Sequence, residues 1–191
     1  MTITDPKTSL RQYLQEGRDA VLWKLDGLPE YEVRRPLTPT GTNLLGLVKH
    51  LTLVETGYFG ETFERPFPDP PLFDPDEFNA DMWATADESR EQITGLYRRA
   101  WAHSDQTISD LDLEARGHVP WWRDRGDVTL HQVLVHVIAE THRHAGHADI
   151  VRELIDGSAG LLPARTNLPD LDEGHWERYR DKLEEVARQA R

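Results

Sequence analysis

The chain has 191 residues, a formal net charge of −12 and no cysteine. A chain of this length forms one domain by default, and so acidic a charge argues against a nucleic-acid partner and against an anionic membrane surface, which need clustered Lys and Arg. The lack of cysteine excludes disulfides and protein thiols, so a reacting thiol would have to come from a substrate.

The N-terminal segment and the hydropathy of the chain predict a cytoplasmic protein. The first eight residues contain no apolar segment typical of a signal peptide. No apolar run reaches the roughly 20 residues that span a bilayer. No Ser/Gly-rich linker separates two halves, so we expect a single domain over residues 1–191.

Hydrophobic periodicity predicts four long helices and a shorter fifth. Thr8 or Ser9 is the expected cap of the first helix, and Thr85 with Glu88 forms a capping-box pattern at the start of the third. Thr129 is the expected cap of the fourth. The five helices are expected over residues 6–28, 43–63, 86–111, 130–156 and 176–190, the last on the outside of the body.

The connecting segments are rich in turn residues. Residues 65–80 hold five prolines and predict a long loop, whose Phe67, Leu72, Phe73 and Phe78 are expected to pack back onto the body. Residues 113–127 also predict a loop, and one of its adjacent tryptophans, Trp121 and Trp122, is expected to line a pocket or an interface. No segment shows a strand pattern, so the prediction is an all-α helical bundle.

The fourth long helix carries a polar stripe where a core face is expected. His136, Glu140, His144 and His147 are spaced by 4, 4 and 3 residues, so they share one face of a helix. Apolar residues around most of the helix leave little surface for a merely solvated polar face. Buried polar groups cost free energy unless something compensates them, and a divalent metal would do so.

The spacing narrows the expected ligands. Glu140 and His144, four residues apart, can both reach one ion from a single helix. A third ligand must come from elsewhere, and His50 is the histidine in an apolar helical context, whereas His103 and His118 have more polar neighbours. Three protein ligands leave a position open for water or substrate, which is typical of catalytic sites. Imidazole and carboxylate suit Zn, Ni, Fe or Mn.

Three further side chains are candidates to support or replace these ligands. His147, His136 and Glu55 fall near the expected site. Groups of this kind hold ligating imidazoles in the correct tautomer and orientation.

Two motifs resemble those of a known superfamily. The run from His136 to His147 resembles the helix-four signature of the DinB/YfiT-like superfamily, His-x3-His-x3-His-Arg-Gly-Gln. The segment from Gly46 to Leu51, with Glu55 after it, looks like that superfamily's helix-two motif. Glu140-Thr141 through His147-Ala148-Asp149 is closest to the branch called DUF664. The resemblance covers about residues 8–157 and leaves 158–191 as a C-terminal extension.

The resemblance implies a fold and a ligand set. The fold is an up-down-down-up four-helix bundle with a long crossover between helices two and three, which the loop at 65–80 fits. The implied ligands are His50, Glu140 and His144. Most superfamily members have His where this chain has Glu140, but the mycothiol-dependent maleylpyruvate isomerase branch is similar in using a His/Glu/His set. Zn or Ni is the expected ion, with Fe or Mn as further candidates, and a homodimer is an expected assembly.

The resemblance also implies an activity on a small molecule. The leading hypothesis is a transferase or isomerase that activates a mycothiol-type thiol for attack on an electrophile, with Trp121, Trp122, Arg143 or Arg152 binding the rest of the thiol. One alternative is a metal-dependent hydrolase with Glu55 or His147 as general base. The other is a helical metal-binding protein without catalytic activity.

Overall fold

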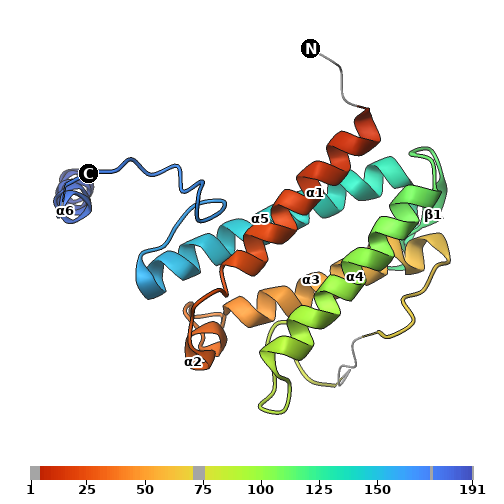
Figure 1. Ribbon diagram of the computed structural model, residues 1–191, viewed down its shortest axis with the longest axis horizontal. Helices are drawn as coiled ribbons and strands as arrows, with labels where there is room; N and C mark the ends of the chain where they lie inside the picture. The colour runs from red at the N-terminus through yellow and green to blue at the C-terminus, as the bar shows by residue number, and fades with distance from the viewer. Residues whose placement is uncertain (1–4, 71–75, 173, 191) are drawn as a thin grey trace.

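The computed structural model describes residues 5–70, 76–172 and 174–190. These residues form mostly helices, which confirms the all-α class, while the up-down-down-up order stays a prediction. The elements, shown in Figure 1, are α1 (Pro6–Trp23), α2 (Glu30–Arg34), α3 (Leu44–Phe59), η1 (Glu61–Phe63), α4 (Arg90–Asp110), β1 (Arg116–His118), η2 (Pro120–Arg125), β2 (Asp127–Thr129), α5 (Leu130–Asp156) and α6 (His175–Gln189).

The four long helices pack in pairs. Helix α1 lies against α5 and α3 lies against α4, and contacts between α3 and α5 join the two pairs (Figure 1). Of the sixteen residues of α3, all except His50 and Leu53 are buried, so α3 is the central helix. The core includes Leu14, Val21, Leu47, Leu51, Tyr97, Ile108, Leu134 and Val137.

Several helix ends differ from the prediction because other side chains act as caps. Helix α1 is capped by Asp5, whose carboxylate accepts from the Thr8 amide at 2.9 Å, and not by Thr8 or Ser9. Helix α4 begins at Arg90, where Ser89 and Gln92 form the capping box. Glu88 instead accepts hydrogen bonds in the preceding loop, so the predicted start near residue 86 was wrong.

The prediction that the chain forms no strand was also wrong. Strand β1 pairs antiparallel with β2, with Arg116 opposite Thr129 and His118 opposite Asp127. Each strand has three residues, too few for an alternating pattern to be visible in the sequence. The hairpin leads directly into α5, which Thr129 caps as expected and which ends before Gly157 at a φ of 78°.

The C-terminal helix and the long loop between α3 and α4 have fewer buried side chains than the sequence predicts. Helix α6 has no buried residue and stands apart from the bundle (Figure 1). In the loop between α3 and α4, Phe67 is buried but Phe78 is 83% exposed. Leu72 and Phe73 lie outside the described residues.

A buried ion network joins α1 to α3 and α4. The guanidinium of Arg18 donates to both carboxylate oxygens of Glu55, at 2.7 and 2.8 Å, and to Asp105 at 2.9 Å. The side chains of Arg18 and Glu55 are 1% and 0% exposed. Burial alone would lower the pKa of Arg18, but the two carboxylates raise it above its usual value. The Arg18 guanidinium therefore stays charged in the interior.

We expect Glu55→Ala to lower the free energy of unfolding by about 3–5 kcal/mol, because it leaves a buried guanidinium without its main partner. Replacing both partners, as Arg18→Met with Glu55→Leu, should cost less than the single change. Urea denaturation measures each variant. Asp69→Ala, which removes the exposed ion pair with Arg99, is the control and should cost less than about 1 kcal/mol. A Glu55→Ala variant as stable as this control would contradict the prediction.

Candidate metal centre

Helices α3 and α5 bring together the three residues that the sequence selected. One ligand atom each from His50, Glu140 and His144 lie within 4.8 Å of one another. His144 Nε2 is 2.9 Å from Glu140 Oε1, and His50 Nε2 is 3.7 Å from the same oxygen. The two imidazole rings meet edge to face, with 4.8 Å between centroids.

This geometry fits one ion. Two ligand atoms of a tetrahedral zinc, each about 2.0–2.1 Å from it, lie about 3.3 Å apart. The observed separations of 2.9 and 3.7 Å fall on either side of that value. Small side-chain movements would therefore let all three atoms contact one divalent ion.

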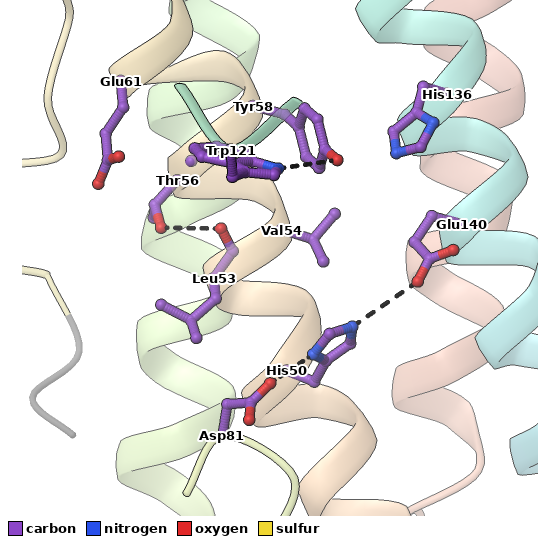
Figure 2. A pocket seen from close by; sticks show the side chains of 11 residues that line it. His50, Leu53, Val54, Thr56, Tyr58, Glu61, Asp81, Trp121, His136 and Glu140 are labelled. Atoms are coloured by element: carbon purple, nitrogen blue, oxygen red, sulfur yellow. Dashed lines mark hydrogen bonds and ion pairs between the residues drawn. The ribbon is translucent and has the colours of Figure 1, made fainter. Parts of the chain in front are cut away.

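The second nitrogen of His50 is held by a carboxylate. His50 Nδ1 donates to Asp81 Oδ2 at 2.7 Å, and this bond leaves the Nε2 lone pair directed toward Glu140 (Figure 2). A carboxylate on the outer nitrogen fixes the tautomer and the ring orientation of a ligating histidine. Asp81 thus holds His50 in the orientation that a ligating histidine needs.

The loop that carries Asp81 is fastened to the first turns of α3. The side chain of Asn43 donates to the Met82 carbonyl at 3.0 Å, and Lys49 Nζ donates to the Trp83 carbonyl at 3.0 Å. A Cβ atom on Gly46 would lie 1.8 Å from the Met82 carbonyl oxygen, so only glycine permits this approach. These contacts place Asp81 beside His50, which lies one turn after Gly46 on α3.

The pKa shifts of His144 and Glu140 on α5 favour the protonation states that bind a metal. Burial lowers the pKa of His144, and nearby His50 lowers it further against the influence of Glu140. Burial would raise the pKa of Glu140, but the hydrogen bond from His144 and the surrounding charges outweigh it and lower that pKa. Neutral imidazole and ionised carboxylate are the metal-binding forms. His147 Nδ1 lies 3.4 Å from His144 Nδ1 and so contacts the outer nitrogen of that ligand.

The other two expected supporting residues lie elsewhere. Glu55 faces Arg18 on the opposite side of α3 and is outside the group of three. His136 lies one turn before Glu140, with its ring 4.7 Å from that of Tyr58 and 4.8 Å from that of Trp122. Burial lowers the pKa of His136, against the opposing influence of Glu140.

Both tryptophans of the hairpin loop form an aromatic wall with Tyr58. The indole N–H groups of Trp121 and Trp122 donate to the Tyr58 hydroxyl oxygen, at 3.2 and 3.0 Å. A Cβ atom on Gly57 would lie 2.9 Å from the Trp121 ring, so glycine lets that ring lie close on α3. Trp121 remains 46% exposed and forms the outer part of the wall.

A cavity of about 540 Å³ lies between this wall and two of the candidate ligands, His50 and Glu140 (Figure 2). Its size falls in the range typical of small-molecule sites. Arg143, 62% exposed and 3.5 Å from Glu140, lies next to it, whereas Arg152 binds Asp156 and two carbonyls at the end of α1. The cavity is lined by His50, Leu53, Val54, Thr56, Gly57, Tyr58, Glu61, Asp81, Trp121, His136 and Glu140.

A sequence model of mycothiol-S-transferases matches residues 9–157, which span α1 to α5. The chain belongs to the mycothiol-S-transferase family. This confirms the resemblance to the DinB/YfiT-like superfamily. A solved structure, described as a conserved protein from Enterococcus faecalis, shares the fold at a TM-score of 0.58 and 15% identity, over 81% of this chain and 99% of that one. No curated protein matches the chain.

Two groups at this candidate site were not among the site residues predicted from the sequence. Asp81 lies 31 residues from His50 in an irregular loop, and no motif marks it. Tyr58 follows His50 by two helical turns, which indicates a shared side of the helix, but its bonds to the tryptophans depend on the hairpin.

Within the described part of the chain, no helix has the length and apolar character to cross a membrane.

We expect the purified protein to bind one divalent ion, and His50→Ala and His144→Ala to lose it, because each removes one of three ligands. Asp81→Asn should weaken binding by roughly 10–100-fold, since it releases the ring of His50. Plasma mass spectrometry and chelator competition measure content and affinity. His131→Ala, an exposed histidine on the same helix, is the matched control. Stoichiometric metal in both ligand variants would exclude the site.

Tyr58→Phe should leave two indole N–H groups without their acceptor. We expect the free energy of unfolding to fall by about 1–3 kcal/mol and two indole N–H resonances to shift in the NMR spectrum. Tyr13→Phe, at an exposed tyrosine of α1, serves as the control and should change neither. Unshifted indole resonances in Tyr58→Phe would show that the wall is held in another way.

Proposed function

We propose that the protein is a metal-dependent S-transferase that joins the sulfur of a mycothiol-type thiol to an electrophile, with His50, Glu140 and His144 as ligands. One observation supports this most: two of the three grouped residues, His50 and Glu140, line a cavity of small-molecule size in a chain of the mycothiol-S-transferase family. If the electrophile returned the thiol after rearrangement, the same site would act as an isomerase.

The two imidazoles and the carboxylate suit zinc or nickel as ligands, and they also suit iron or manganese. A bound ion of this kind supplies the Lewis acidity that converts a thiol to a thiolate at neutral pH. The side chains around it have separate tasks. Asp81 keeps a proton on His50 Nδ1, and His147 contacts Nδ1 of His144, so both ligating nitrogens face the ion site.

Cavity residues can also manage protons. The neutral imidazole of His136, one helical turn from Glu140, is placed to accept the proton released by the thiol. The Tyr58 hydroxyl accepts from two indoles, so its own proton is left to donate to an oxygen of a bound molecule.

The proposed reaction balances without an oxidant or reductant. A sulfur lone pair forms the new C–S bond, and the displaced group leaves with the electron pair of the broken bond. When the electrophile is an activated alkene, its π electrons move to the neighbouring carbon, which takes up the proton from the thiol.

The hydrolase alternative has less support from the site. Glu55, one proposed general base, has both oxygens bound to Arg18, and His147, the other, contacts His144. Neither is therefore free beside the cavity to activate water.

The activity test incubates ion-loaded protein with mycothiol and a fluorogenic bromobimane. We expect conjugate to form faster than in the protein-free reaction, and the rate enhancement to fall by at least about 100-fold in Glu140→Gln, since the loss of a ligand exceeds the effect of an outer group. Chromatography with mass detection quantifies the conjugate, and His131→Ala is the matched control. Hydrolysis of esters or amides without any conjugation would favour the hydrolase.

A further inference from the structure

A second cavity, of about 550 Å³, adjoins the first. The two share Trp121 and His136 as a common wall. A transfer between two reactants needs space for both on either side of the reacting sulfur, and the pair of cavities provides it. The second cavity is lined by Trp121, Trp122, Arg123, Arg125, Gln132 and His136.

The two cavities carry opposite charge. The first is lined by the carboxylates of Glu61, Asp81 and Glu140, whereas the second has the guanidinium groups of Arg123 and Arg125 and no carboxylate in its lining. This contrast stands out in a chain with a net charge of −12. In the metal-free protein an anion is therefore repelled by the first cavity and attracted by the second.

Neither arginine is neutralised by a carboxylate in the part of the chain that the structure describes. Asp124, which lies between them in sequence, does not line the cavity, and Asp127 accepts from His118 instead. Two guanidinium groups at one cavity offer the planar, forked donors that match carboxylate and phosphate oxygens. The indole rings beside them offer a flat apolar surface.

The unusual backbone conformation of Arg123 supports a binding role for this loop. Arg123 has a φ of 51° and a ψ of −124°, which a residue with a side chain rarely adopts. Such a conformation costs about 1–3 kcal/mol and is found most often at binding and active sites. The loop around it is closed by bonds between Val119 and Gly126, at 2.8 Å, and between Gly126 and Arg123, at 3.1 Å.

Building on the S-transfer above, we propose that the second cavity binds the anionic group of the electrophile. The substrate class is thus an electrophile with a carboxylate or phosphate-like group on an apolar or aromatic body. Arg123 and Arg125 bind the anion, the tryptophans contact the body, and the reactive carbon extends past His136 toward the thiol in the first cavity.

The binding arm of the test uses p-toluate, which cannot react, and metal-free protein. We expect p-toluate to quench tryptophan fluorescence with saturation, and the double variant Arg123→Gln/Arg125→Gln to bind it at least about tenfold more weakly, from the loss of two charged hydrogen bonds. Methyl p-toluate should bind the two proteins equally. Arg116→Gln, an exposed arginine of the same hairpin that does not line the cavity, is the matched control. Equal p-toluate affinity in the double variant and the wild type would overturn the proposal.

The kinetic arm compares 4-(chloromethyl)benzoate, its methyl ester and 4-(chloromethyl)phenylphosphonate as electrophiles with mycothiol. We expect the double variant to raise KM for one or both anions by about tenfold or more and to leave the ester and the metal content unchanged. The carboxylate and phosphonate rates show which anion is preferred. Conjugation that is equally fast with the ester and both anions would overturn the anionic-substrate inference and leave the S-transferase standing. If no electrophile is conjugated, S-transfer fails and the binding arm alone decides whether the cavity takes anions.

Discussion

Imidazole and carboxylate groups lose their water when two helices close over them, and the rest of this structure depends on how that loss is compensated. Between α3 and α5, each ligand candidate has a partner: Asp81 for His50, His147 and Glu140 for His144, and Arg143 for Glu140. An unpaired polar group in this position would cost several kcal/mol. The polar stripe is therefore compatible with a stable bundle even before any ion is considered.

Helix α3 carries polar contacts on two sides. His50 faces α5, and Glu55, five residues later and about 140° around the helix, faces Arg18 of α1. The first contact forms the candidate site, and the second fixes the central helix within the bundle. Because these contacts lie on different faces, the Glu55 carboxylate contributes to the position of α3 and not to the candidate site.

The long helices and the proximity of Glu140 to His144 could be predicted because both follow from short-range spacing, whereas His50 was chosen for its apolar helical context. Periodic apolar residues marked the long helices, and the i, i+4 pair of Glu140 and His144 marked the site. Asp81 could not be found in this way, since it meets His50 through a loop with no period. The β-hairpin was missed because its strands have three residues each, and with it the arginines of the second cavity. Helix α6 has the apolar stripe of a packed helix but buries none of its residues.

The contact between Asp81 and His50 joins the candidate site to a segment outside the bundle core. Asp81 belongs to the loop that connects α3 to α4, and the same loop is fastened to α3 by Asn43 and Lys49. Any movement that lifts this loop must break the bond that holds the imidazole in its ligating orientation. Release of an ion from these groups and displacement of Asp81 would then be thermodynamically linked: whatever favours one would favour the other by the same free energy. The position of Asp81 and the affinity of the candidate site for an ion would thus belong to one equilibrium.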